Sequence, residues 1–230
     1  MTEVKICGIR NEADLRVVLE VRPETIGIIC GPNTLSADAI GPETTKKLFE
    51  LIPSGIKKQI VSGAAETSEL LEMARYVGAD TIQAQARLAP EEATELWFQR
   101  RDLEIVRVVE VGKPEALGDA REAAVLADAV LLDSPGIKLG GSGKTHDWKL
   151  SAKIAAEIRS PSLKVILAGG LSPGNLREAI SVVAPDEVDV NSGLDDFHGD
   201  KDLKLCQQFM AIARESPSTH LVEHFDRVNA

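Results

Sequence analysis

Residues 164–190 read KVILAGGLSPGNLREAISVVAPDEVDV and contain one full unit of a strand–helix alternation that indicates the fold class. The apolar run at 164–168 is typical of a buried strand, and it ends at the glycine pair Gly169-Gly170. Residues 173–180 carry apolar side chains at spacings of three and four, which predicts a helix with Ser172 as N-cap and Pro173 in its first turn. A second strand-like run follows at 187–190. The stretch therefore predicts strand, helix and strand with short connections.

The same alternation extends over the whole chain. Strand-like runs occur at 3–7, 25–30, 56–61, 80–84, 104–109, 129–132, 164–168 and 187–190, with amphipathic stretches between them. Eight such repeats indicate an α/β fold in which a parallel sheet closes as a (β/α)8 TIM barrel. An open doubly wound sheet is the alternative. Because no Pro-, Gly- or Ser-rich linker interrupts the pattern, we expect one domain at 1–214 and a C-terminal tail at 215–230.

The composition excludes several classes of function. A formal net charge of -10 disfavours a nucleic-acid partner. Cys7, Cys30 and Cys206 lack metal-ligand spacing, as do the four histidines, which are expected at the surface. No basic-then-apolar leader precedes the first strand, and no apolar run approaches the ~18 residues of a membrane span. We expect a cytoplasmic protein without metal, membrane or nucleic-acid partner.

Candidate acid and base groups follow two of the predicted strands. The carboxyl ends of barrel strands surround one pocket, so side chains there become neighbours. Cys7 ends the first run, and its thiolate could serve as a base or nucleophile if positive charge lowered its pKa; the alternative is a buried small hydrophobe. Asp133 follows the sixth run and could serve as a general acid. Its alternative roles are a helix cap or a hydrogen bond that orders a loop.

Glycine-containing turns follow the last two strands. Gly169-Gly170 and Ser192-Gly193 occur where TIM barrels often bind phosphate through backbone N–H groups, although such glycines can also be purely conformational. Asp189 alternates with two valines and should point to the barrel mouth, where it could bind a sugar hydroxyl or hold a loop. The two glycine-containing turns favour a phosphate ligand.

A glycine-rich loop follows Asp133. It contains Gly140 and Gly141, which would let backbone close over a substrate. Gly143-Lys144-Thr145 imitates a nucleotide-binding P-loop, but Lys138 stands where that motif needs its first glycine. ATP is therefore not implied.

Five blocks of sequence together resemble the phosphoribosylanthranilate isomerase family. They are VKICGI at 4–9, LLDS at 131–134, GGSGKTHDW at 140–148, LAGGL at 167–171 and VDVNSG at 188–193, in the family's order and spanning all eight strands. The resemblance implies a cofactor-free and metal-free Amadori rearrangement in tryptophan biosynthesis. Its substrate is N-(5-phosphoribosyl)anthranilate, and its product is 1-(o-carboxyphenylamino)-1-deoxyribulose 5-phosphate.

The resemblance also implies roles for residues of this chain. Asp133 would protonate the furanose ring oxygen, and Cys7 would remove the C2′ proton. Asp189 would orient the sugar hydroxyls. The 5′-phosphate and the rest of the sugar would be held by the glycine loops, through Gly140, Gly141, Gly169, Gly170, Ser192 and Gly193.

Two departures from the family pattern fall on the anthranilate side. The basic residue expected after the second strand is missing, since residues 31–40 contain no Lys or Arg, and the family's Gln-Leu-His-Gly is here Gln83-Ala84-Gln85-Ala86. Arg10, Arg87 or Arg107 could bind the anthranilate carboxylate instead, or could be structural. The alternatives are an isomerase of another phosphoribosylamine or phosphosugar without that carboxylate, and a non-catalytic phosphosugar-binding barrel. A monomer and a homodimer are both open.

Overall fold

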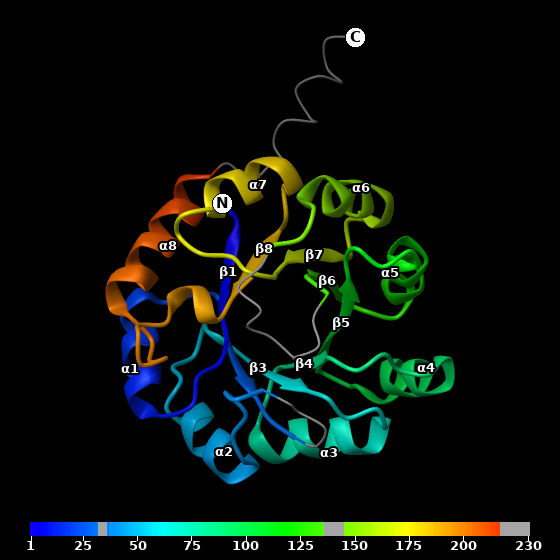
Figure 1. Cartoon of the computed structure of the whole chain (residues 1–230). Coiled ribbons are helices and arrows are strands. Elements are labelled where there is room, and N and C mark those ends of the chain that lie inside the picture. Colours follow the sequence, from blue (N-terminus) through cyan, green and yellow to red (C-terminus); the bar gives the residue numbers. More distant parts are fainter. Residues whose placement is uncertain (32–35, 136–144, 217–230) are drawn as a thin grey trace.

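The computed structural model describes residues 1–31, 36–135 and 145–216. Its parallel strands close into a barrel in the order β1 to β8, with β1 paired to both β2 and β8 (Figure 1). The strands are β1 (Glu3–Ile6), β2 (Thr25–Ile29), β3 (Lys57–Ser62), β4 (Thr81–Ala84), β5 (Glu104–Glu110), β6 (Ala129–Asp133), β7 (Lys164–Leu167) and β8 (Glu187–Val190). The predicted (β/α)8 TIM barrel is confirmed, and closure rules out the open doubly wound sheet.

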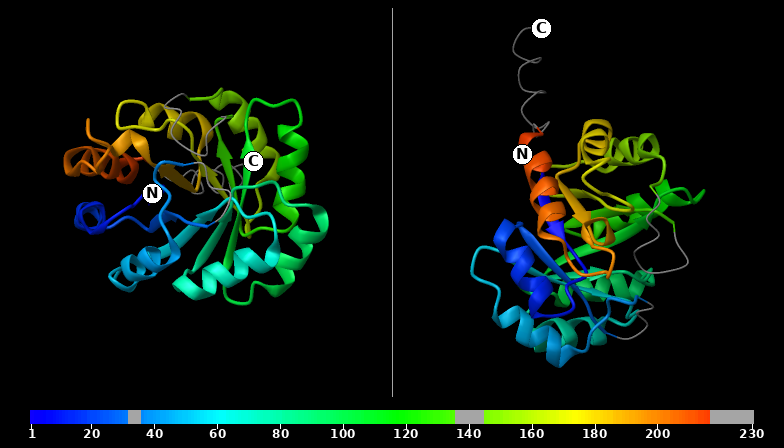
Figure 2. Two further views of the ribbon diagram at one scale, coloured as in Figure 1. Left: turned by 60° about the horizontal axis from the view of Figure 1, so that its bottom comes forward. Right: turned by 60° about the vertical axis from the view of Figure 1, so that its left-hand side comes forward.

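A helix follows each strand, and the helices surround the barrel in chain order (Figures 1 and 2). They are α1 (Glu12–Val21), α2 (Pro42–Glu50), α3 (Thr67–Val77), α4 (Pro90–Gln99), α5 (Ala116–Val125), α6 (Trp148–Ile158), α7 (Leu176–Val183) and α8 (Leu203–Glu215), with a short 3-10 helix η1 (Ser192–Leu194) after β8. Local sequence sets several of their ends. The Asn11 side chain caps α1 by accepting from the N–H groups of Ala13 and Asp14, and Gly78 ends α3 in the left-handed conformation.

The predicted start of α7 is wrong by one turn. The helix begins at Leu176 rather than at Pro173, since the Asn175 side chain binds back to the Ser172 N–H and the Gly170 carbonyl. Ser172 is therefore part of the turn and does not cap the helix. The described residues end one position after α8, so the tail predicted at 215–230 lies almost wholly outside them.

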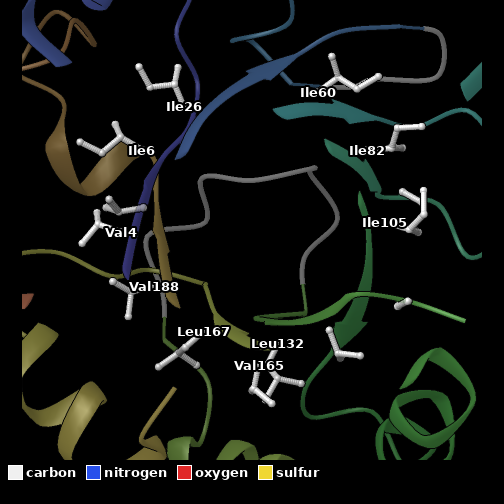
Figure 3. Packing of buried hydrophobic residues seen from close by; sticks show 14 of the residues in the cluster. Val4, Ile6, Ile26, Ile60, Ile82, Ile105, Leu132, Val165, Leu167 and Val188 are labelled. Carbon is white, nitrogen blue, oxygen red and sulfur yellow. The ribbon is translucent and has the colours of Figure 1, made fainter. Parts of the chain in front are cut away.

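The main hydrophobic core lies between the strands and the helices. Alternate strand residues point outward and meet apolar helix residues such as Leu15, Leu70 and Phe209, all buried. Figure 3 shows the strand side of this layer, which includes Val4, Ile6, Ile26, Ile60, Ile82, Ile105, Leu132, Val165, Leu167 and Val188. Burial on this scale explains why the eight apolar runs could be found from sequence.

The interior of the barrel is divided into an apolar and a polar part. Val106, Leu131 and Ile166, from β5 to β7, form a separate buried cluster. The Lys5 ammonium lies opposite, fully buried, and donates to Gln83 Oε1 at 2.8 Å and Asp189 Oδ2 at 2.6 Å. Since β1 and β4 are not neighbours in the sheet, Lys5 reaches across the interior. This polar part lies directly beneath the carboxyl ends of the strands.

Within the described residues, the helices are too short or too polar to cross a membrane.

Candidate active site

Cavities open at both ends of the barrel. The larger, of about 490 Å³, lies at the amino ends of the strands and is lined by residues such as Glu3, Lys57 and Glu187. The smaller, of about 80 Å³, lies at the carboxyl ends. TIM barrels carry out their chemistry at the carboxyl ends, because the loops that follow the strands converge there. The smaller cavity is therefore the candidate active site.

This smaller cavity brings together residues that are far apart in sequence. It is lined by Cys7, Ile29, Val61, Gln83, Gln85, Asp133, Ala168, Gly169, Gly170, Leu171, Asp189, Val190, Asn191, Ser192 and Gly193. Every predicted acid, base, hydroxyl-binding and phosphate-binding residue that the structure describes is in this set. Gly140 and Gly141 lie outside the described residues.

Cys7 lies at the end of β1, beside a buried cation. Burial raises the pKa of the Cys7 thiol, and the positive charge of Lys5 opposes that rise. Gly27 on β2 makes room for both side chains: an added Cβ there would lie 2.7 Å from Lys5 Cε and 2.8 Å from Cys7 Sγ. The two groups therefore share the space above Gly27, where Lys5 can stabilise a thiolate.

Lys5 also holds Asp189. Burial alone would lower the pKa of Lys5, but the neighbouring acidic groups Asp189, Cys7 and Glu187 together raise that pKa above its ordinary value. The lysine is therefore charged, and its hydrogen bond uses Asp189 Oδ2. Asp189 Oδ1 is buried and has no partner among the described residues, although it faces the same cavity. An unsatisfied buried acceptor is costly, so a ligand hydroxyl at this point would be bound favourably.

Asp133 ends β6, and β7 and β8 separate that strand from β1 in the closed sheet. Burial raises the pKa of Asp133 to about 6, although the hydrogen bond from the Ser134 N–H to Oδ1 at 2.7 Å acts in the opposite direction. A carboxyl group with this pKa retains a proton near neutral pH in a useful fraction of molecules. It can therefore donate a proton to a substrate oxygen.

The glycine turns after β7 and β8 form another wall. Gly169 and Gly170 have positive φ angles of 87° and 66°, and their N–H groups donate to no other described residue. A Cβ on Gly193 would lie only 1.9 Å from the Leu171 carbonyl oxygen, so the two turns are in backbone contact. Free N–H groups on closely packed glycine turns are a suitable site for a phosphate.

His146 departs from the expected surface position. It is half-buried between Ser134 after β6 and Ser151 in α6, with ring nitrogens 3.0 and 2.5 Å from the two hydroxyl oxygens. Burial lowers the pKa of His146 to about 4, so the ring is neutral at pH 7. It ties the start of α6 to the residue after Asp133. His198 is exposed, and His220 and His224 lie outside the described residues.

The three candidate arginines do not line the cavity. Arg10 binds Asp14, Asp200 and the Gly199 carbonyl at the edge of the mouth. Arg87 is exposed and pairs with Asp119 at 2.9 Å. Arg107 is buried between β5 and α5, where its guanidinium lies 3.4 Å from Glu122. Each guanidinium therefore has a carboxylate partner away from the cavity.

Sequence reasoning missed Lys5, Gln59 and Gln83. Gln59 Nε2 and Lys5 Nζ both donate to Gln83 Oε1, at 2.7 and 2.8 Å. A signal was present, since charged or amide side chains inside apolar strands are unusual and need partners. The identity of those partners depends on barrel closure, because residues 5 and 83 come from strands that do not pair.

The chemistry that this arrangement allows is proton transfer to and from a bound ligand. The cavity offers a buried acid at Asp133, a thiol beside a cation at Cys7 and an open carboxylate oxygen at Asp189. It also offers the N–H groups of Gly169 and Gly170, which donate to no other described residue. In the described part of the chain, no group of three or more His, Cys, Asp or Glu side chains could hold a metal ion.

Known proteins share both the sequence pattern and the fold. A family model for N-(5'phosphoribosyl)anthranilate (PRA) isomerase matches residues 4–211. N-(5'-phosphoribosyl)anthranilate isomerases of Haloferax volcanii and Methanothrix thermoacetophila are each 34% identical over 215 residues, covering 93% of this chain and 94% and 99% of theirs. The phosphoribosyl anthranilate isomerase structure from Thermotoga maritima is similar, with a TM-score of 0.81 and 29% identity over 94% of this chain and 100% of its own.

Another similar structure holds a ligand. It is a phosphoribosyl anthranilate isomerase in complex with reduced 1-(o-carboxyphenylamino)-1-deoxyribulose 5-phosphate, with a TM-score of 0.77 and 26% identity over 94% of this chain and 100% of its own.

Proposed function

The chain belongs to the N-(5'-phosphoribosyl)anthranilate isomerase family, and from that membership we propose that Cys7 and Asp133 are its catalytic base and acid. The enzyme converts N-(5'-phosphoribosyl)anthranilate to 1-(o-carboxyphenylamino)-1-deoxyribulose 5-phosphate, a step of tryptophan biosynthesis. The observation that carries the assignment of roles is the cavity that Cys7 and Asp133 share with the open Oδ1 of Asp189.

The reaction begins at Asp133. Burial raises the pKa of its carboxyl group to about 6, and in the molecules that retain this proton the group donates it to the furanose ring oxygen. The C1′–O bond then breaks, and the anilino nitrogen lone pair forms a C=N double bond with C1′. The result is an open-chain Schiff base, and Asp133 is left as a carboxylate.

Cys7 acts next. Its thiolate takes the proton from C2′, and the electron pair of that C–H bond moves into a C1′=C2′ double bond while the C=N π electrons return to nitrogen. The enolamine then tautomerises to the ketone. Lys5 supports this step, since its buried ammonium opposes the rise of the thiol pKa. The acid thus acts on the ring oxygen and the base on C2′, the two atoms on either side of C1′.

The remaining cavity residues position the sugar phosphate. Asp189 Oδ1 accepts hydrogen bonds from the ribose hydroxyls, because its other oxygen is already held by Lys5. The 5′-phosphate binds to the N–H groups of Gly169, Gly170 and Gly193 and to the Ser192 hydroxyl. Gly140 and Gly141 contribute to substrate binding from a loop outside the described residues.

We propose that the enzyme is a monomer or a homodimer. We propose a single domain at 1–214 and a cytoplasmic enzyme that acts on a small phosphoribosyl substrate.

The experiment is turnover of enzymatically generated N-(5'-phosphoribosyl)anthranilate by purified protein. The wild type should consume it, and Cys7→Ser and Asp133→Asn should each lower kcat by about 10²-fold to 10⁴-fold, since each removes one proton-transfer group. Circular dichroism serves as the folding control for both variants. Wild-type activity with undiminished turnover in either folded variant would refute the assigned role of that residue.

A further inference from the structure

The two ends of the active-site cavity differ in chemistry. The glycine turns after β7 and β8 lie at one end, and Ile29, Val61, Gln83 and Gln85 from β2 to β4 lie at the other. If the phosphate binds at the glycine end, as proposed above, the anthranilate ring lies among the residues from β2 to β4. Lysine and arginine are absent from the described residues that line this cavity. Among the described residues, this end of the cavity therefore offers neutral donors to the carboxylate on the ring.

Gln83 fixes the direction of the hydrogen bonds at this end. A lysine ammonium can only donate, so the Gln83 atom 2.8 Å from Lys5 Nζ must be the amide oxygen. Gln59 Nε2 donates to the same oxygen at 2.7 Å. Both contacts are buried. The orientation of the Gln83 amide therefore follows from chemistry and leaves its nitrogen to donate.

Gln85 receives that donation. Gln83 Nε2 lies 2.9 Å from Gln85 Oε1, so the Gln85 oxygen is engaged as an acceptor. The other half of the Gln85 amide is its Nε2, which carries two N–H donors and has no acceptor among the described residues. Because Gln85 lines the cavity, the chain of hydrogen bonds that begins at Lys5 and Gln59 ends in a donor available to a ligand.

We propose that Gln85 Nε2 donates a hydrogen bond to the anthranilate carboxylate and so determines the enzyme's preference for a carboxylated aglycone. This inference rests on the proposed function and adds a specificity-determining residue to it. Lys5 and Gln59 are positioning residues for Gln85, acting through Gln83. A carboxylate is the ligand group that this donor fits best, since a hydrogen bond to a charged acceptor is about twice as strong as one to a neutral acceptor.

The test compares two substrates in matched variants. One substrate is N-(5'-phosphoribosyl)anthranilate, and the other is its analogue made with aniline, which lacks the carboxylate. Gln85→Met removes the donor at similar size, and Gln85→Glu replaces it with a negative charge. Gln99 is exposed and its side chain donates to Glu95 on α4, so Gln99→Glu serves as a control with the same change of charge.

Both Gln85 variants should raise KM for the anthranilate substrate by about tenfold to a hundredfold, with kcat changed by less than about threefold. Their kcat/KM for the aniline analogue should stay within about threefold of the wild type, and Gln99→Glu should change neither substrate. Calorimetric titration with reduced 1-(o-carboxyphenylamino)-1-deoxyribulose 5-phosphate gives the same comparison without turnover.

Equal losses of kcat/KM on both substrates would overturn the proposal, because Gln85 would then support the site without recognising the carboxylate. Unchanged KM in both folded Gln85 variants would also overturn it. A wild type that turns over only the aniline analogue would refute the proposed substrate, a result that is distinct from either of these.

Discussion

At the scale of single residues, Gly27 determines how closely the thiol and its cation approach. It carries no catalytic group, yet a side chain there would occupy the space of both Lys5 Cε and Cys7 Sγ. Gly27→Ala should therefore displace both groups and lower kcat/KM by about a hundredfold, since displacements of about 1 Å have such effects. The rate of Cys7 alkylation as a function of pH reports the thiol pKa in the same variant.

The matched control is Gly118→Ala. Gly118 lies in α5, and a Cβ there meets no atom within 4 Å. This substitution should leave kcat/KM unchanged and stabilise the protein by about 0.5–1 kcal/mol, because alanine is favoured over glycine within a helix. A Gly27→Ala enzyme as active as the control would show that the space above Gly27 is not needed.

At the scale of elements, the turns after β7 and β8 function as one unit. Gly193 in η1 lies against the Leu171 backbone so closely that a Cβ would overlap the carbonyl oxygen. Rotation of a side chain cannot relieve an overlap with backbone. Gly193→Ala should therefore separate the turns, lower the free energy of unfolding by about 1–3 kcal/mol, and raise KM for the substrate by about tenfold.

Gly174→Ala provides the comparison within the same region. Its Cβ would meet only Ser172 Oγ, at an ordinary contact distance of 3.8 Å. We expect wild-type KM and a change in unfolding free energy below about 0.5 kcal/mol, measured by urea denaturation. If both glycine variants raise KM equally, contact between the turns is not what shapes the phosphate site.

At the scale of the whole molecule, the ionisation of a buried carboxyl group at the amino end of the barrel makes the free energy of unfolding depend on pH. Glu187 is buried beneath Asp189 at that end, and burial raises its pKa to about 7 from 4.5. An unfolded chain ionises this group at lower pH than the folded protein does. The contribution of Glu187 to stability therefore falls as pH rises from about 4.5 to about 7, and it stays low above that range.

Replacing this carboxyl group should remove the cost. Glu187→Gln is expected to raise the free energy of unfolding at pH 8 by about 1–3 kcal/mol and to change it little at pH 4.5. Urea denaturation at the two pH values measures the difference. The exposed Glu91 in α4 offers Glu91→Gln as a charge-matched control. An equal gain at both pH values would contradict the proposed ionisation cost.

The barrel could be predicted from the sequence, and so could the end of the barrel at which the candidate site lies. Each strand is a short apolar run whose outward side chains pack on an amphipathic helix, and this periodicity is local. Cys7, Asp133 and the glycine turns could be proposed as site residues because each directly follows or ends a strand. The start of α7 was missed, because a single asparagine side chain shifted the cap from Ser172 to Asn175.

Which polar groups meet could not be predicted from the sequence and is evident in the folded barrel. Lys5, Gln83 and Asp189 come from three strands, and their contacts exist because the sheet closes and their side chains point into one interior. For the same reason the sequence could not show whether Arg10, Arg87 or Arg107 faces the cavity. Each has a carboxylate partner distant in the chain or on a neighbouring helix, which only the fold reveals. Contacts over long sequence separations depend on closure of the barrel, and local patterns do not encode them.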